Sequence, residues 1–372
     1  MIKVAYISDI QLFGVTAFGG IKASLKTIDM LKDFCEVDVY CLNGHKKTDR
    51  LKKSSFFNHS IVSSTVLAIK KALPYDFFAV SLKNRKHNYE TLSILEKLHS
   101  NQYDIIILNS VFLFPFFDSE KHKIIIDSLD LMSDRQISFL KSGIKPWFKI
   151  TEKEEMDVFS QIKGVLSIQE DEKEKIQPHN PNVVVFPRPW KINHKGTNYS
   201  ENVLNKKKLV FVGGNSNFNI DALNWFIEHV LGSISEYYDL YVYGLVCSSI
   251  TRKHNALHLI GEFESHDDVY SNSYLSINPI YYGSGLKTKN IESISYGVPV
   301  ITTDVGIQGM QEFLNSGIYT MKDNSPSEWI DFLVDCEISE KAFTNDIDIS
   351  QKILIFKFGR KSQLETLKKI LN

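Results

Sequence analysis

The fold is decided by the stretch from Asn278 to Gly306, which reads NPIYYGSGLKTKNIESISYGVPVITTDVG. A glycine-bracketed turn precedes residues 287–296, in which apolar side chains recur at helical spacing and predict a helix. Gly297 lies at the C-cap position of this helix, where glycine commonly ends a helical turn. The β-branched run 298–302 follows and predicts a short buried strand. The stretch therefore predicts a turn, a helix and a strand in succession.

The turn before this helix predicts a phosphate site. Free backbone N–H groups and the positive end of the helix dipole meet at a helix N-terminus, and Lys287 and Lys289 add positive charge beside it. Glu292 lies further along the helix, where its carboxylate can accept hydrogen bonds from two neighbouring sugar hydroxyls. These residues fit a nucleotide diphosphate site with a ribose clamp. An ordinary helix with surface lysines and a solvated Glu has the same spacing.

The same stretch resembles the donor-binding motif of the GT-B glycosyltransferases, especially the retaining family-four group that builds bacterial surface polysaccharides. That motif has a Gly-Ser-Gly-Leu-Lys turn, a helix with Glu, a Gly-x-Pro-Val strand entry and a Val-Gly end, all present here in order. Residues 209–231 resemble the strand, glycine turn and helix that open the second domain of this family. Residues 257–280 resemble its base-contacting loop and the helix and strand that follow. The resemblance spans most of the chain and is sharpest between residues 209 and 306.

Short apolar runs alternate with amphipathic stretches along the whole chain, which predicts parallel sheets covered by helices on both faces. The strand candidates are 3–8, 37–42, 105–108, 123–127, 164–168 and 183–186 in the first half, and 209–212, 240–243, 257–259, 275–278, 298–302 and 318–321 in the second. The polar segment 191–208 is the best linker between the halves. Residues 348–371 suggest a terminal helix that is broken near Gly359.

The resemblance implies an α/β fold of two tandem Rossmann-like, doubly wound domains facing a cleft, which is the GT-B fold. In that family the first domain holds the acceptor, the second holds the nucleotide sugar, and a C-terminal helix crosses back to the first domain. We accordingly expect an acceptor domain, a linker, a donor domain and a returning helix over residues 1–190, 191–208, 209–350 and 351–372.

The donor site that the resemblance implies combines glycine turns with charged and aromatic side chains. Lys287 and Glu292 are its predicted catalytic members, because a lysine beside the helix N-terminus would stabilise the leaving pyrophosphate. The predicted donor-binding residues are Gly19, Gly20, Gly213, Gly214, Asn215, Phe263, Tyr282, Gly283, Ser284, Gly285, Leu286, Lys287, Thr288, Lys289 and Glu292.

The first half supplies the predicted acceptor residues, Gly14, Asp130 and Arg135. Asp127 also follows a strand at its carboxyl end, where open α/β sheets place their ligands. We predict Asp127 as the catalytic base if the enzyme inverts. The alternative for this region is that Asp130 or Asp134 caps the next helix.

Two departures from the family pattern bear on the chemistry. Retaining members have a first Glu where this chain has Ser284, which leaves the stereochemical outcome open. They also often carry an Arg and a Lys in the opening turn of the second domain, where this chain has Gly214 and Ile220. Phosphate recognition is therefore assigned to the helix-terminal amides and to Lys287, Thr288, Lys289 and Arg188.

Composition sets the remaining bounds. The chain has 372 residues, of which 43% are hydrophobic and 23% charged, an ordinary composition for two domains. Net charge is −1, but residues 1–149 are basic and the remainder acidic, so the first half could face an anionic membrane or an acidic acceptor. Four cysteines show no metal-ligand spacing, and no signal peptide or membrane-spanning run is found. We expect a cytoplasmic protein that is either free or peripherally bound to the cytoplasmic membrane, with no nucleic-acid partner.

The expected reaction is transfer of a sugar from a nucleotide diphosphate sugar to a hydroxyl of an oligosaccharide or lipid-linked glycan acceptor. The resemblance favours retention of configuration and a role in bacterial capsule, O-antigen or glycoconjugate synthesis. No metal is expected, and no cofactor beyond the nucleotide sugar, which is the donor substrate. Two alternatives remain: a non-hydrolysing nucleotide-sugar epimerase, and a catalytically silent sugar-binding or partner protein of the same fold.

Overall fold

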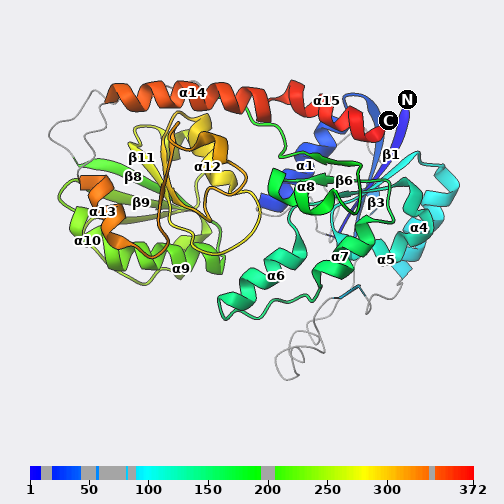
Figure 1. The fold of residues 1–372 in the computed structure, drawn as a ribbon, viewed down its shortest axis with the longest axis horizontal. Coiled ribbons are helices and arrows are strands. Elements are labelled where there is room, and N and C mark those ends of the chain that lie inside the picture. The colour runs from blue at the N-terminus through cyan, green and yellow to red at the C-terminus, as the bar shows by residue number, and fades with distance from the viewer. Residues whose placement is uncertain (10–18, 43–55, 58–80, 83–88, 194–205, 335–339) are drawn as a thin grey trace. The chain divides into compact units, whose positions relative to one another are not determined.

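The structure is a computed structural model that describes residues 1–9, 19–42, 56–57, 81–82, 89–193, 206–334 and 340–372. The chain divides into two compact units (Figure 1). Unit 1 contains Met1–Arg188 and Gln363–Asn372, and unit 2 contains Pro189–Ser362. Each unit has one parallel sheet flanked by helices, which confirms the predicted pair of Rossmann-like α/β domains.

Unit 1 is built on a seven-stranded sheet in the order β3-β2-β1-β4-β5-β6-β7. The strands are β1 (Ile2–Ser8), β2 (Cys35–Cys41), β3 (Phe56–Phe57), β4 (Ile105–Leu108), β5 (Ile124–Asp127), β6 (Gly164–Ser167) and β7 (Val183–Val185). Every pairing is parallel. The strand order reverses between β1 and β4, and β4, β5 and β6 are buried along their whole length. Runs of isoleucine and leucine form these strands because both of their faces are covered by helices.

The helices of unit 1 connect successive parallel strands. They are α1 (Gly19–Leu31), α4 (Tyr89–Asn101), η2 (Val111–Leu113), α5 (Phe114–Phe117), η3 (Asp118–Lys123), α6 (Met132–Lys141), α7 (Glu152–Phe159) and α8 (Glu170–Ile176). Helix α7 begins with a reciprocal capping box between Thr151 and Glu154. Hydrophobic clusters lie on both faces of the sheet.

Unit 2 has a six-stranded sheet in the order β10-β9-β8-β11-β12-β13. The strands are β8 (Lys207–Val212), β9 (Tyr238–Tyr243), β10 (Leu257–Gly261), β11 (Leu275–Asn278), β12 (Val300–Thr303) and β13 (Ile318–Met321). The strand order reverses between β8 and β11, and the loops that follow these two strands leave the same edge of the sheet. Doubly wound sheets bind their ligands at this reversal point.

The helices of unit 2 include a long C-terminal pair. They are α9 (Asn217–Phe226), η4 (Ile227–Leu231), α10 (Gly232–Ile234), η5 (Leu245–Ser249), α11 (His266–Tyr270), α12 (Thr288–Ser295), η6 (Gln311–Phe313), α13 (Pro326–Val334) and α14 (Glu340–Phe358), with α15 (Arg360–Leu371) continuing into unit 1. The pair is interrupted at Gly359, as predicted, where an added Cβ would lie 2.2 Å from the Ile355 carbonyl oxygen. Leu367, Ile370 and Leu371 of α15 join the core of unit 1, so the terminal helix returns to the first domain as predicted.

All the strands predicted from apolar runs are present, with shifts of a few residues at their ends. Strand β3 was not predicted, because it holds only Phe56 and Phe57. The chain passes from unit 1 to unit 2 between Arg188 and Pro189, and residues 194–205 of the expected linker lie outside the described part of the chain.

Candidate functional site

Two loops meet at the reversal point of the sheet in unit 2. One follows β8 and contains Gly213 and Gly214, and the other follows β11 and leads into α12. Lys289 Nζ donates a hydrogen bond of 2.6 Å to Asn219 Oδ1, and Asn219 Nδ2 donates one of 2.8 Å to the Gly214 carbonyl oxygen. These bonds join the predicted glycine turn of the second domain to the predicted phosphate-binding helix.

The loop before α12 has a shape that depends on glycine. Gly283 and Gly285 have φ angles of 129° and 70°, which side-chain-bearing residues rarely adopt. Lys287 Nζ donates hydrogen bonds of 3.1 Å and 2.7 Å to the carbonyl oxygens of Ser284 and Gly285. No side chain caps the N-terminus of α12, which begins at Thr288. The ammonium of Lys287 therefore holds the loop, and the Thr288 and Asn290 amides of the first helical turn donate to the carbonyl oxygens of Leu286 and Lys287 at 3.1 Å and 2.9 Å.

The surroundings of Lys289 disfavour its charged form. Its ammonium lies 4.3 Å from the centre of the Phe211 ring. Burial, followed by repulsion from Lys287, lowers the pKa of Lys289 to about 7, while the charge of Glu292 opposes the shift. An anion bound beside this group would raise its pKa, because an opposite charge favours the protonated form.

Glu292 contacts a residue that was not predicted. Its Oε1 lies 3.5 Å from Nε2 of His266, and the Glu292 side chain is 15% exposed. The imidazole is stacked at 8° to the Tyr270 ring and at 22° to the Tyr296 ring, and it meets Phe263 edge-on. The sequence gives no spacing signal for His266, since this contact joins α11 to α12. The structure brings Phe263 and Glu292, both predicted, together through this imidazole.

We expect replacement of His266 by phenylalanine to weaken nucleotide binding about fivefold at neutral pH, because the ring stacking is retained while the contact that orients the Glu292 carboxylate is lost. Calorimetric titration with a panel of nucleoside diphosphates measures this effect. His258→Phe is the matched control, since His258 is also stacked on a tyrosine, Tyr241, at 4.5 Å. Equal affinities for His266→Phe and the wild type would contradict the positioning role.

The other predicted donor residues lie around the same loops. Tyr282 donates a hydrogen bond of 2.5 Å to Asp221 Oδ2 and packs against Phe218 at 5.1 Å between ring centres. Burial, and then the Asp221 carboxylate, raise the pKa of the Tyr282 phenol. Asn215 accepts a hydrogen bond of 2.7 Å from the Ser249 hydroxyl. Tyr282 is therefore anchored to α9 and stiffens the loop that it begins.

The predicted catalytic base of unit 1 is fully buried and already paired. Asp127 Oδ1 accepts a hydrogen bond from Arg188, and Asp127 Oδ2 accepts one of 2.9 Å from the Tyr6 hydroxyl. Asp127 is 0% exposed and Arg188 is 2% exposed. A general base must reach the proton that it removes, so the geometry favours a structural ion pair for Asp127. The Arg188 guanidinium likewise donates to Asp127 and to the Phe186 carbonyl oxygen. These buried contacts disfavour the predicted contact between Arg188 and phosphate.

The predicted acceptor residues fall in different surroundings. Asp130 and Arg135 form an ion pair of 3.6 Å near the start of α6. The first amides of that helix, those of Met132 and Ser133, each donate a hydrogen bond of 2.9 Å to the Glu155 carboxylate. Glu155 therefore caps the helix, and the alternative that Asp130 caps it is wrong. Gly19 and Gly20 begin α1, whereas Gly14 lies outside the described residues.

Glu155 and Glu172 form a buried acidic cluster with Asp130. Burial raises the pKa of Glu155 from 4.5 to about 7, and burial, followed by the charge of Asp130, raises the pKa of Glu172 well above its usual range. Between pH 4.5 and about 7 the carboxyl of Glu155 is protonated in the folded protein but ionised in the unfolded chain. The free energy of unfolding should therefore fall as the pH rises from about 4.5 through 7.

Glu172→Gln should therefore raise the free energy of unfolding in urea above that of the wild type at pH 8, and leave it nearly unchanged at pH 5. A single group shifted as Glu155 is can contribute about 3 kcal/mol to such a pH dependence. The exposed Glu152→Gln on α7 is the control. A wild-type stability that rises between pH 5 and 8 would contradict the assignment.

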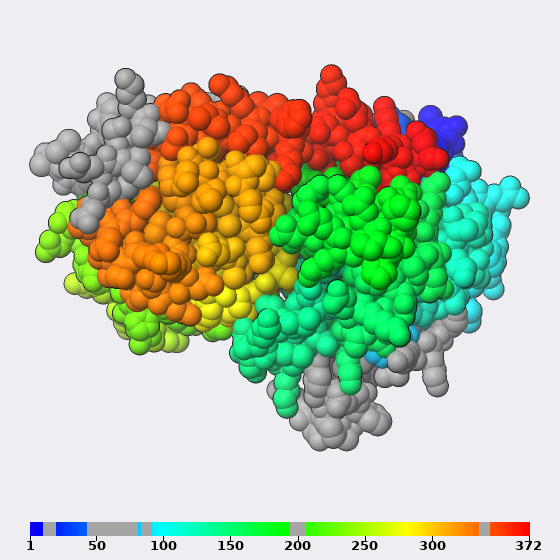
Figure 2. Space-filling view, viewed as in Figure 1, coloured from blue at the N-terminus to red at the C-terminus, as the bar shows by residue number. Residues whose placement is uncertain are grey.

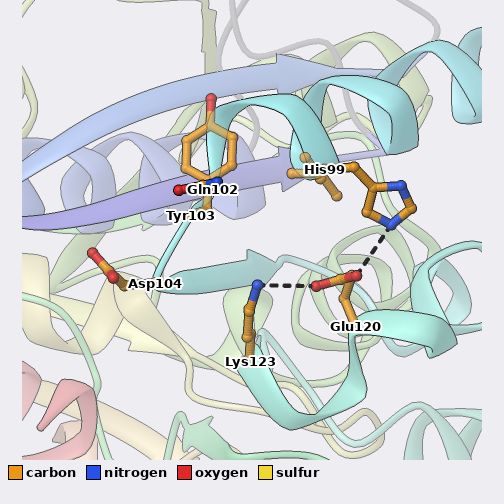
Figure 3. Close-up of a pocket in the computed structure, with 7 residues that line it drawn as sticks. His99, Gln102, Tyr103, Asp104, Glu120 and Lys123 are labelled. Carbon is orange, nitrogen blue, oxygen red and sulfur yellow. Dashed lines mark hydrogen bonds and ion pairs between the residues drawn. The ribbon is translucent and has the colours of Figure 1, made fainter.

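A hollow of about 560 Å³ lies at the opposite edge of the unit 1 sheet (Figure 3). Its lining residues are Leu98, His99, Gln102, Tyr103, Asp104, Glu120 and Lys123. Glu120 faces both His99, at 3.1 Å, and Lys123, at 3.2 Å. Because Asp104 and Lys123 precede β4 and β5, this hollow lies at the amino ends of the strands, away from the edge that binds ligands in doubly wound sheets. We assign no function to it.

Within the described ranges, no group of three His, Cys, Asp or Glu side chains is placed to hold a metal ion. The same part of the chain contains no helix that is long and apolar enough to cross a membrane.

Comparisons with known proteins bear on the family and the fold. The family model described as "Glycosyl transferases group 1" matches residues 206–336. No curated protein matches the sequence.

Solved structures match over the whole chain. Anabaena HepE, in complex with UDP and glucose, is 13% identical with a TM-score of 0.69, covering 100% of this chain and 99% of that chain. S. aureus TarM, in complex with fondaparinux, α-GlcNAc-glycerol and UDP, is 12% identical with a TM-score of 0.73, covering 100% of both chains. WaaG, a glycosyltransferase involved in lipopolysaccharide biosynthesis, is 13% identical with a TM-score of 0.61, covering 97% and 98%. The chain therefore has the GT-B fold that the resemblance predicted, and its residues 206–336 match the model of the glycosyl transferases group 1 family.

Proposed function

We propose that this protein transfers a glycosyl group from a nucleotide diphosphate sugar to a hydroxyl of a glycan acceptor. The observation that carries the proposal is the chain of hydrogen bonds from Lys289 through Asn219 to Gly214. These bonds bring the start of α12, the Lys289 ammonium and the glycine turn after β8 together at the reversal point of the sheet. The group 1 family match over residues 206–336 and the UDP present in the HepE and TarM structures support the same reading.

Each part of the site has a separate role in binding the donor. The two hydroxyls of the ribose would donate to the Glu292 carboxylate, which His266 orients from the side. The diphosphate would lie at the start of α12, where backbone amides, Thr288 and Lys289 meet. Gly214 is exposed with open space beside its Cα, so a ligand can approach its backbone closely, whereas Gly213 packs against Phe211 and Asn219.

In the transfer step, the bond between the sugar anomeric carbon and the diphosphate oxygen breaks, and a bond from that carbon to the acceptor oxygen forms. Negative charge grows on the leaving diphosphate, and the amides of α12 together with protonated Lys289 would stabilise it. This arrangement needs no metal ion. In the retaining mode that we favour, the leaving phosphate takes the acceptor proton.

We further propose that unit 1 holds the acceptor, that the acceptor is an oligosaccharide or a lipid-linked glycan, and that the product is a bacterial surface polysaccharide or glycoconjugate. WaaG is involved in lipopolysaccharide biosynthesis and the TarM structure contains α-GlcNAc-glycerol, and both support this class of acceptor by analogy. The reaction would take place in the cytoplasm, at the inner face of the membrane.

A screen of nucleotide sugars with and without glycan acceptors tests the proposal. We expect nucleoside diphosphate to be released only when an acceptor is present, with a product one sugar heavier by mass spectrometry. Conversion of one nucleotide sugar into another without any acceptor would favour the epimerase. Failure to bind any nucleoside diphosphate would remove both enzymatic functions and leave a sugar-binding or partner protein.

A further inference from the structure

The chain leaves unit 1 through a residue with an unusual backbone. Arg188 is the last residue of the first part of unit 1, and Pro189 is the first residue of unit 2. The φ angle of Arg188 is 71°, in the left-handed region that disfavours bulky side chains. Three of the five non-glycine residues with a positive φ in the described part of the chain are asparagines, which tolerate this region. A residue before proline also favours extended backbone, so the surrounding structure must hold Arg188 in this conformation.

The guanidinium of Arg188 attaches this exit residue to unit 1. It is 2% exposed, donates to the Asp127 carboxylate, and donates a hydrogen bond of 3.1 Å to the Phe186 carbonyl oxygen. Asp127 on β5 in turn accepts a hydrogen bond of 2.9 Å from Tyr6 on β1, although β4 lies between these two strands. The buried network therefore reaches from the exit residue to the middle of the sheet. Removing either charge alone would leave the other buried without its partner, which is strongly destabilising.

The segment after the boundary is bonded to unit 2. The Trp190 amide donates a hydrogen bond of 2.8 Å to the carbonyl oxygen of Phe358, the last residue of α14. The Asn193 amide donates one of 2.8 Å to the carbonyl oxygen of Ser295, the last residue of α12. Pro189, whose ring restricts its own φ, is thus the single residue between the attachments to the two units.

The return crossing lies within α15, which is visible in red on the surface (Figure 2). The helix break at Gly359 comes directly before this helix. Leu367 and Ile370 of α15 belong to the same buried hydrophobic cluster as Tyr6 and Phe186. Both crossings are therefore attached to one part of unit 1.

We propose that Arg188 is a positioning residue, whose ion pair with Asp127 fixes the exit of the chain from unit 1. Motion of one unit against the other is then confined to the bonds around Pro189 and Gly359. The buried network holds the strained exit residue, so the crossing is a fixed point and not a loose linker. This role rests on the proposed function, because a fixed crossing would set how a donor on one unit meets an acceptor on the other.

Distances between two spin labels, one on each unit of the full chain, test the proposal by pulsed electron paramagnetic resonance. Glu174→Cys on α8 and Ser233→Cys on α10 supply exposed labelling sites. Cys247 and Cys336 are replaced by alanine to prevent additional labelling, and the other two cysteines are buried.

The test variant combines Asp127→Asn with Arg188→Gly. Glycine accepts a φ of 71° without strain, and asparagine leaves no charge buried without a partner, so the variant loses the attachment alone. We expect the width of the distance distribution to at least double. Tyr6→Phe, which removes one hydroxyl from the network, is a milder variant that should keep the fold and broaden the distribution by a smaller amount.

Asn180→Ala is the matched control. Asn180 is buried in unit 1, away from the crossing, where its Nδ2 donates hydrogen bonds of 2.8 Å and 3.1 Å to the carbonyl oxygens of Phe159 and Ile162. We expect a lower melting temperature with a distance distribution as narrow as that of the wild type. Affinity for a panel of nucleoside diphosphates, measured by calorimetry, should be the same in every variant, because the proposed donor site lies in unit 2.

Two outcomes would overturn the proposal. One is a distribution that neither the double variant nor Tyr6→Phe broadens. The other is equal broadening by Asn180→Ala, which would show that a less stable unit 1 is enough to loosen the crossing. If the double variant does not fold, Tyr6→Phe alone decides the matter. Absence of nucleotide binding together with the expected broadening would contradict only the proposed function, so the two can fail separately.

Discussion

Replacing Glu292 by alanine is expected to lower the affinity for UDP about 100-fold while the protein stays folded. The proposed clamp gives the carboxylate two hydrogen bonds from ribose hydroxyls, and bonds to a charged acceptor contribute about 1.5–3 kcal/mol each when both partners are present. Glu292 lies on α12 with its side chain 15% exposed, and its carboxylate contacts His266. We expect its removal to take away this contact without unfolding the protein. Calorimetric titration measures the affinity, and thermal unfolding checks the fold.

Glu228→Ala serves as the control for this change. Glu228 is also in unit 2, is 46% exposed, and pairs only with Arg252 among the described salt bridges. We expect its variant to bind UDP as the wild type does. If Glu292→Ala keeps its affinity for UDP, the ribose assignment is wrong and the donor lies elsewhere.

Replacing Lys289 by methionine is expected to weaken UDP binding by roughly 10- to 100-fold and to slow transfer further, because the ammonium supports both the bound diphosphate and the charge that grows on it. The wild type should also take up close to one proton on binding at pH 8. Free Lys289, with a pKa of about 7, is largely neutral there, and the diphosphate raises that pKa. Affinity should consequently fall as pH rises above 7.

Calorimetry in two buffers with different ionisation enthalpies measures the proton uptake directly. Lys289→Met should abolish it, whereas Lys253→Met, at an exposed position of unit 2, should leave both uptake and affinity unchanged. Proton uptake that persists in Lys289→Met would show that another group titrates on binding.

The sheets could be predicted from sequence because each strand is a short run of apolar, largely β-branched residues between helices. Runs such as Ile105–Leu108 and Ile124–Asp127 have both faces buried, and such runs are recognisable without any pairing information. The helix break at Gly359 was equally local. Strand β3 could not be found this way, since two phenylalanines are too short a pattern to distinguish from a loop.

The site was predictable only where its parts are adjacent in sequence. The turn from Tyr282 to Lys289 and the nearby Glu292 form one motif, and they lie together as expected. The partners from distant segments were missed, because Asn219 and His266 carry no signal until the sheet brings their loops to α12.

For Asp127, the local sequence suggested a role that a distant partner makes unfavourable. Its place at a strand end suggested catalysis, but its partner Arg188 lies 61 residues away and occupies the carboxylate. The pairing could not be read from the neighbours of either residue.

The return of α15 to unit 1 has a consequence for biosynthesis. Leu367, Ile370 and Leu371 are almost wholly buried in the core of the first unit, yet the ribosome makes them after every residue of the second. Domains usually fold in the order in which they emerge. Here the core of unit 1 lacks these three side chains until all of unit 2 has been translated. Unit 2 is therefore the first of the two that can reach its final packing.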